Sequence, residues 1–221
     1  MTATYDVVFL IDVDNTLLDN DAVERDLRAH LQKEFGLGCA ERYWALFEQL
    51  RTELGYADYL GALQRYRVEH PRDSRLLAVS LFLVDYPFRD RLYARALDTL
   101  RFLNRIGPVV ILSDGDVVFQ PRKVARAGLW EAVAGRVLIY IHKEQMLDDV
   151  SQRYPSQRYV MIDDKIRILT AMKQIWGERL ITVFVRQGHY AESPDVAQYP
   201  TADIAVEAIG DLKNFDWSPW L

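Results

Sequence analysis

Cysteine is almost absent from this chain, which has 221 residues and a single cysteine, Cys39. One cysteine cannot form a disulfide within the chain, and such low usage is typical of proteins in a reducing compartment. The fold therefore depends on a hydrophobic core, and a chain of this length buries roughly 70–75% of the surface of its unfolded form. We expect a cytoplasmic protein.

Long apolar runs and basic clusters are also missing. The first apolar run, which contains Phe9, ends at Asp12, so we expect no signal peptide. No run approaches the roughly 18 apolar residues that a membrane-spanning helix needs. The 27 lysines and arginines are outnumbered by 32 aspartates and glutamates, which gives a net charge of −5. This charge does not favour nucleic acids or anionic membranes, and we predict neither as a partner.

Short apolar runs rich in β-branched residues recur along the chain, as is typical of strands covered on both faces. One precedes Asp12, and five more are Val109–Ser113, Arg136–Ile141, Tyr159–Asp163, Leu180–Val185 and Ala202–Val206. Helical patterns separate the later runs, at Arg122–Ala127, Glu144–Tyr154 and Ile166–Trp176. Alternation of strand and helix predicts an α/β fold with a doubly wound parallel sheet.

The segment between Asn20 and Asp85 has no strand pattern. Val23, Leu27, Leu31 and Phe35 recur every four residues, with Asn20 as the expected N-cap, and three further helical stripes follow. We therefore predict an all-helical insertion after the first strand. A helix over Arg91–Arg105 should lead back into the sheet, and the aromatic tail "NFDWSPWL" should pack onto the core.

Unusual polar residues follow four of the predicted strands, at the points where these strands end. They are Asp12 and Asp14, Ser113 and Asp114, His142 and Lys143, and Asp163 and Asp164. Because a doubly wound sheet binds ligands beyond the carboxyl ends of its strands, we expect these side chains to meet in one crevice. Carboxylates that meet there repel one another unless a cation compensates their charge.

The cation that suits these residues is Mg²⁺, because the carboxylates provide only oxygen ligands. The four histidines lie far apart in sequence, without the spacing of a zinc site. A lysine and a serine at the same edge would complete a phosphate pocket. A carboxylate in such a pocket can attack phosphorus and form an aspartyl-phosphate, while a second aspartate moves the proton.

Four motifs, in order and each after a strand, resemble those of the haloacid dehalogenase-like (HAD) superfamily of phosphohydrolases. "DVDNT" resembles the first motif and "VVILSD" the second. "IYIHKE" places Lys143 where the third-motif lysine is expected, although Lys123 and Lys165 compete for that role. "VMIDDK" is similar to the paired-aspartate form of the fourth motif. The resemblance extends over essentially the whole chain and implies a Rossmann-like core.

The resemblance also implies a role for each motif residue. Asp12 is the expected nucleophile, and Asp14 the acid/base that presents its backbone carbonyl to the metal. Ser113 and Lys143 are expected to bind the transferring phosphoryl group. Asp164 is the metal ligand expected from the fourth motif, because many members have glycine at the position of Asp163. The expected metal-site residues are Asp12, Asp14, Asp164 and Asp163.

Members of the family carry a cap domain at one of two points in the chain. Only 30 positions separate Ser113 from Lys143, and a helix and a strand already occupy them. The resemblance therefore implies a helical cap at residues 19–86, inserted into a core of residues 1–18 and 87–221. Arg51, Arg65 and Arg67 of the cap have two open interpretations: they bind a second anionic group of the substrate, or they are exposed helix residues.

These observations predict a Mg²⁺-dependent phosphatase that cleaves a small phosphorylated metabolite, as a monomer or a homodimer. Three alternatives remain. Haloacid dehalogenases of the superfamily lack the second aspartate, so Asp14 disfavours them. Phosphomutases use the same four motifs. A catalytically idle member would bind a phosphorylated ligand without turnover, but such proteins usually lose a motif aspartate.

Overall fold

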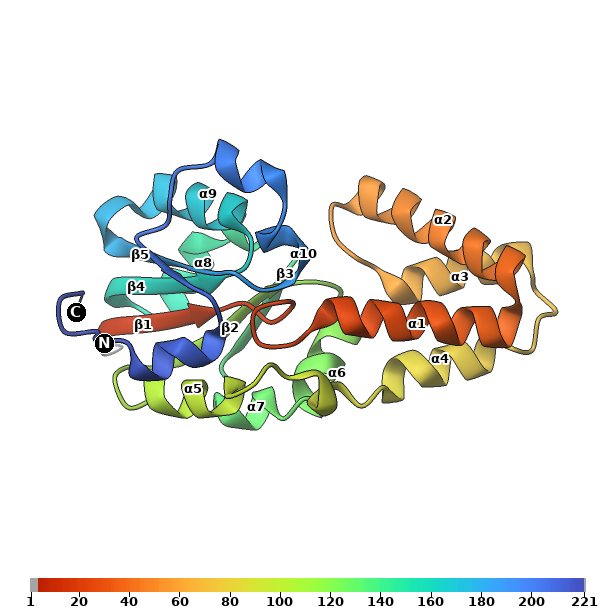
Figure 1. The fold of residues 1–221 in the computed structure, drawn as a ribbon, viewed down its shortest axis with the longest axis horizontal. Helices are drawn as coiled ribbons and strands as arrows, with labels where there is room; N and C mark the ends of the chain where they lie inside the picture. Colours follow the sequence, from red (N-terminus) through yellow and green to blue (C-terminus); the bar gives the residue numbers. More distant parts are fainter. Residues whose placement is uncertain (1–3, 221) are drawn as a thin grey trace.

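A six-stranded parallel sheet organises the computed structural model, which describes residues 4–220 (Figure 1). The strands lie in the order β3-β2-β1-β4-β5-β6, and every neighbouring pair is parallel. They span Tyr5–Ile11 (β1), Val109–Asp114 (β2), Val137–Tyr140 (β3), Ser156–Asp163 (β4), Leu180–Val185 (β5) and Ile204–Val206 (β6). The predicted doubly wound α/β fold is confirmed.

Helices cover both faces of the sheet (Figure 1). Successive strand residues point to opposite faces, so Phe9 packs on one side and Leu10 on the other. The first face packs against α5 (Ala96–Leu103), α6 (Phe119–Arg126) and α7 (Leu129–Ala132). The second packs against α8 (Leu147–Arg153) and α9 (Ile166–Trp176). Each strand is therefore apolar on both faces, which is why the sequence shows runs without alternation.

The chain between β1 and β2 forms a helical lobe beside the sheet (Figure 1). Its helices are α1 (Asn20–Phe35), α2 (Leu37–Leu54), α3 (Tyr59–Glu69) and α4 (Leu76–Asp85), as predicted for an all-helical insertion. The expected N-cap was wrong by one residue. Asp19 accepts the backbone N–H of Ala22 at 2.8 Å, whereas the side chain of Asn20 accepts a hydrogen bond from Lys123.

The helix that returns to the sheet is shorter than predicted. The pattern indicated Arg91–Arg105, but α5 begins at Ala96 and ends at Leu103. Leu92 is extended and pairs with Leu18 in an antiparallel bridge, and Arg95 has a left-handed φ of +65°. A 3-10 helix, η1 (Phe88–Arg91), precedes this extended residue. Pairing with the loop after β1 therefore overrides the local helical pattern.

Shorter elements complete the fold. They are the helix α10 (Gly188–Ala191) and the 3-10 helices η2 (Lys143–Gln145), η3 (Gly177–Arg179), η4 (Pro194–Gln198) and η5 (Ile209–Asn214). The aromatic tail packs on the core as predicted. Trp217 is buried and lies edge-on to Phe9, with 5.1 Å between ring centroids. Leu221 lies outside the described residues.

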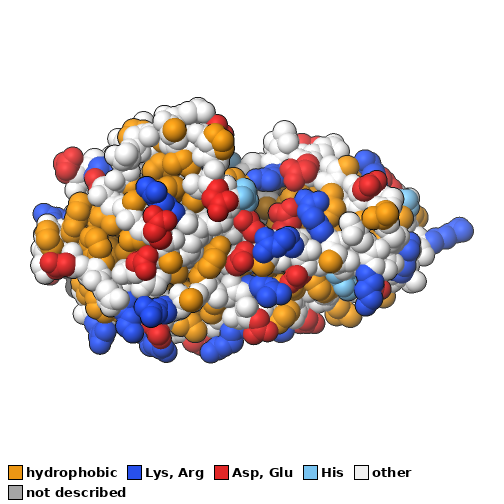
Figure 2. Space-filling model, viewed as in Figure 1, with side chains coloured by type: hydrophobic (Ala, Val, Ile, Leu, Met, Phe, Trp, Pro, Cys, Tyr) orange, Lys and Arg blue, Asp and Glu red, His pale blue; other side chains and the backbone are white. Residues whose placement is uncertain are grey.

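The surface carries charged side chains of both signs, interspersed on the face shown in Figure 2. Acidic and basic groups also lie over the junction between the core and the helical lobe on this face. Across residues 4–220, none of the helices combines the length and the apolar character that crossing a membrane requires.

Burial in the central sheet predicts a large stability difference between two isoleucines. Ile162 on β4 is fully buried, whereas Ile175 on α9 is 62% exposed. We expect Ile162→Ala to lower the free energy of unfolding by about 2–5 kcal/mol, because it leaves a cavity in a packed core. Ile175→Ala should change it by less than about 0.5 kcal/mol. Urea unfolding followed by circular dichroism measures both, and similar losses would contradict this packing.

Candidate active site

Three buried carboxylates meet at the carboxyl edge of the sheet. Asp12 directly follows β1, Asp163 ends β4, and Asp164 is the next residue. The two strands are neighbours, with Ile11 paired to Ile162, so their ends bring the acids together. One oxygen from each carboxylate lies within 4.8 Å of the others, and none of the three residues is more than 3% exposed. Such a cluster is unfavourable without positive charge.

Lys143 supplies part of that charge. It begins η2, just beyond β3, and its side chain is buried. The ammonium lies 2.6 Å from Asp12 Oδ1 and 2.7 Å from Asp163 Oδ2. Burial alone would lower the pKa of Lys143, but the carboxylates of Asp12 and Asp163 outweigh it and raise the pKa. The lysine is therefore charged, and it is Lys143 that contacts Asp12.

The remaining oxygens of the cluster suit a cation. Within residues 4–220, Asp12 Oδ2 and both carboxylate oxygens of Asp164 are buried without a hydrogen-bond partner. Asp163 differs, because Oδ1 accepts the backbone N–H of Lys165 at 2.8 Å and Oδ2 contacts Lys143. Burial and the charge of Asp163 raise the pKa of Asp164 well above its ordinary value. Unpartnered oxygens this close together fit a hard divalent cation.

Asp14 is separated from this cluster by its own partners. Lys123 Nζ lies 2.7 Å from Asp14 Oδ1, and the amide of Gln120 donates to Oδ2 at 3.3 Å. Lys123 is buried and also donates to Asn20 Oδ1 at 3.0 Å. From the sequence, Lys123 was considered only as an alternative to Lys143 for the third-motif lysine, and Gln120 was not identified. The available signal was their spacing of three residues, which places both on one face of α6.

Ser113 and its neighbours complete the edge. Ser113 Oγ lies 3.4 Å from Asp12 Oδ1 and accepts a hydrogen bond from Gln120 at 3.0 Å. Asp114 accepts the backbone N–H of Lys143 at 2.7 Å, and Thr16 accepts that of Asp164 at 3.0 Å. The structure thus brings to one edge every residue that the sequence indicated as catalytic or metal-binding: Asp12, Asp14, Ser113, Lys143, Asp163 and Asp164.

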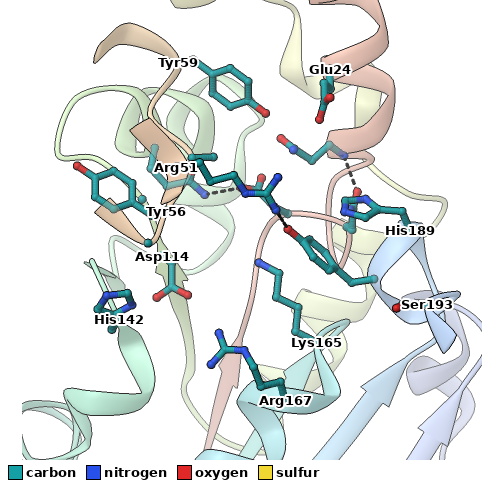
Figure 3. A pocket seen from close by; sticks show the side chains of 18 of the residues that line it. Glu24, Arg51, Tyr56, Tyr59, Asp114, His142, Lys165, Arg167, His189 and Ser193 are labelled. Carbon is teal, nitrogen blue, oxygen red and sulfur yellow. Dashed lines mark hydrogen bonds between the residues drawn. The ribbon is translucent and has the colours of Figure 1, made fainter. Parts of the chain in front are cut away.

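A cavity of about 410 Å³ lies over this edge, between the sheet and the helical lobe. Arg51 and Tyr56 line it from the lobe, and Asp114, His142 and Lys165 line it from the core (Figure 3). The lobe contributes both charge and aromatic surface. The cavity can therefore hold a molecule larger than a phosphate group.

Contacts between the lobe and the core flank the cavity. Arg51 on α2 donates a hydrogen bond to the hydroxyl of Tyr190 on α10. His189 Nδ1 lies 2.6 Å from Asp21 Oδ1 at the start of α1. Gly55 packs so tightly on His142 that an added Cβ would come within 2.6 Å of the imidazole ring. These contacts place the lobe over the functional edge of the sheet.

Comparison with known proteins places the chain in a family. The pattern of a hydrolase family, the haloacid dehalogenase-like hydrolases, matches residues 7–175. The chain is 66% identical to a haloacid dehalogenase-like hydrolase from Burkholderia xenovorans LB400, over 96% of this chain and 99% of that one, with a TM-score of 0.92. None of the curated proteins compared gave a match.

More distant structures share the fold. The HAD hydrolase YfnB from Bacillus subtilis, described as bound to magnesium, is 16% identical over 96% of this chain and 98% of that one, with a TM-score of 0.60. The L-2-haloacid dehalogenase from Xanthobacter autotrophicus is 19% identical over 99% of this chain and all of that one, with a TM-score of 0.60. Given the family pattern and the close relative, this chain belongs to the haloacid dehalogenase-like hydrolases.

Proposed function

We propose that the protein is a Mg²⁺-dependent phosphatase that hydrolyses small phosphate monoesters through an aspartyl-phosphate on Asp12. The observation that carries this proposal is that two aspartates close together in sequence have different surroundings. Asp12 is buried in the acidic cluster against Lys143, whereas Asp14, two residues later, lines the cavity and is held by Lys123. Two acids in different surroundings can act as nucleophile and as acid/base.

The metal site we propose uses Asp12 and Asp164, whose carboxylates keep unpartnered oxygens, together with the backbone carbonyl of Asp14. Asp163 fits a different role, because its oxygens are engaged by Lys143 and by the backbone of Lys165. When bound, the ion supplies positive charge that offsets the carboxylates and polarises the phosphoryl oxygens. The magnesium described in YfnB of Bacillus subtilis supports this choice.

In the first step, a carboxylate oxygen of Asp12 attacks phosphorus, a new P–O bond forms and the bond to the ester oxygen breaks. Asp14 donates a proton to the departing alkoxide, so the alcohol leaves neutral. Lys143 and the hydroxyl of Ser113 stabilise the charge on the phosphoryl oxygens. Their positions beside Asp12 Oδ1, at 2.6 and 3.4 Å, suit this role.

In the second step, water attacks the phosphorus of the aspartyl-phosphate. Asp14, now a carboxylate, takes a proton from that water, and the bond between phosphorus and Asp12 breaks. Inorganic phosphate leaves and both aspartates return to their starting forms. We propose that the cap, residues 19–86, excludes other water during these steps by closing on the core of residues 1–18 and 87–221.

Dehalogenation is the strongest alternative, since structures with the same fold include L-2-haloacid dehalogenases. A halide leaves without a proton, so that reaction has no need for a second aspartate. The presence of Asp14 at the wall of the cavity therefore supports ester hydrolysis. A cytoplasmic location, a monomeric or dimeric state and a small phosphorylated substrate remain part of the proposal.

Replacing the nucleophile tests the reaction directly. We expect Asp12→Asn to lower phosphate release from p-nitrophenyl phosphate and a panel of phosphorylated metabolites at least about 1,000-fold, because no aspartyl-phosphate can form. The assay uses Mg²⁺, with EDTA as the metal-free comparison. Asp6→Asn, an exposed change at the opposite end of β1, is the matched control. Near-normal turnover by Asp12→Asn would refute the assignment, and halide release from 2-chloropropionate would favour the dehalogenase.

Metal binding can be tested without turnover. We expect Mg²⁺ to raise the thermal unfolding temperature of the wild type, because it binds the folded state and relieves repulsion in the acidic cluster. Asp164→Asn should abolish this rise and the heat of Mg²⁺ binding in calorimetry. Asp148→Asn, on the exposed face of α8, should retain both. Undiminished Mg²⁺ binding by Asp164→Asn would remove Asp164 from the proposed site.

The proton donor can be tested through the leaving group. Asp14→Asn should lower kcat/KM for an alkyl ester such as glycerol 3-phosphate at least about tenfold more than for p-nitrophenyl phosphate. Nitrophenolate leaves readily without a proton, whereas an alkoxide does not. The value of kcat/KM depends only on steps up to the first irreversible one, which is release of the alcohol. It therefore does not include the later role of Asp14 as a base. Equal losses for the two esters would argue against Asp14 as the acid.

A further inference from the structure

Most charged groups that face the cavity already have partners. Lys123 pairs with Asp14, and Arg167 lies 3.2 Å from Glu144. The carboxylates are engaged as well: Glu24 binds Arg28, Asp195 accepts from Gln198 and Asp114 accepts the N–H of Lys143. Two cations at the centre of the cavity are different, namely Arg51 from α2 and Lys165 from the start of α9.

Lys165 is half-buried, and its side chain points into the cavity (Figure 3). Among residues 4–220, no carboxylate oxygen lies within 4.0 Å of its ammonium and no side-chain hydrogen bond satisfies it. Its nearest described contact is the face of Tyr190, with the ammonium 4.7 Å from the ring centroid. The carboxylates of Asp12, Asp163 and Asp164 act on this ammonium through space but do not contact it. Its N–H donors therefore remain available to an anion.

Arg51 approaches the same tyrosine from the cap. Its guanidinium donates to the Tyr190 hydroxyl, and its nearest carboxylate, Glu48, is exposed and 3.7 Å away. An exposed pair at that distance is weak, and it leaves further donors of the guanidinium available. Arg51 lines the cavity from the cap and Lys165 lines it from the core (Figure 3). The two cations thus converge from opposite walls of the cavity.

We propose that Arg51 and Lys165 form a subsite for a second anionic group, so that the preferred substrates are phosphate esters whose alcohol carries a carboxylate or a second phosphate. The proposal rests on the proposed phosphatase function. The transferring phosphoryl group has its own partners in Lys143 and Ser113, which leaves Arg51 and Lys165 for the rest of the substrate. The other candidate arginines do not qualify: Arg65 pairs with Glu53 at 2.6 Å, and Arg67 is exposed.

Matched pairs of esters test this selectivity. 3-Phosphoglycerate is compared with glycerol 3-phosphate for the carboxylate, and fructose 1,6-bisphosphate with fructose 6-phosphate for the second phosphate. We expect kcat/KM of the wild type to be at least about tenfold higher for the more anionic ester of one pair, because two charged donors bind its extra group. The pair that shows the preference identifies the anion.

Variants then assign the preference to the two residues. Lys165→Met and Arg51→Gln should each reduce the ratio of kcat/KM values within that pair at least about fivefold. Arg67→Gln, which removes the same charge from an exposed cap position, should keep the ratio. Calorimetry on Asp12→Asn gives a second readout without turnover, in which the more anionic ester binds more tightly and loses this advantage when Lys165→Met is added.

The outcomes separate this proposal from the phosphatase assignment. Equal turnover of both esters in both pairs would overturn the subsite and leave the phosphatase intact. Equal losses for both esters in Lys165→Met would mean that Lys165 serves the transferring phosphoryl group, which also overturns the subsite. No hydrolysis of any ester by the wild type would overturn the phosphatase function and the subsite with it.

Discussion

The contact of the Lys143 ammonium with Asp12 and Asp163 is the interaction on which the site depends. It joins the ends of three strands, because Lys143 follows β3, Asp12 follows β1 and Asp163 ends β4. The three carboxylates are buried and would repel one another. The Lys143 ammonium reduces this repulsion but does not balance the charge of all three. The charge that remains, on unpartnered oxygens of Asp12 and Asp164, is what a divalent cation would balance. The same imbalance would underlie both the proposed metal binding and the proposed reactivity of Asp12.

The second aspartate acquires a separate role through its separate surroundings. Asp14 is only two residues from Asp12, yet Lys123 and Gln120 of α6 hold it at the wall of the cavity. Lys123 also binds Asn20, at the start of α1, so the proposed acid/base Asp14 and the first cap helix share one buried lysine. The proposed closure of the cap would therefore affect the orientation of Asp14 through Lys123. A substrate that contacts the cap from the cavity would thereby also affect the position of Asp14.

Local patterns predicted the sheet and six residues of its functional edge, since a buried strand leaves a clear apolar run and its end fixes where the next polar residue lies. What the sequence did not reveal depends on contacts between distant segments. Tyr190 faces Arg51 and Lys165 only because α10 lies under the cap, and Lys123 reaches Asp14 only because α6 packs there. Likewise, the pairing of Leu92 with Leu18 shortened a helix that the local pattern extended to Arg91. No single segment contains these signals.

The central claim is that Asp12 becomes phosphorylated during turnover. Rapid acid quenching of the wild type with a turned-over ester and Mg²⁺, followed by proteolysis and mass spectrometry, measures this most directly. The account predicts a phosphorylated peptide with the modification on Asp12, absent from protein quenched without ester. Steady hydrolysis with no phosphorylated Asp12, or with phosphate on another residue, would contradict it.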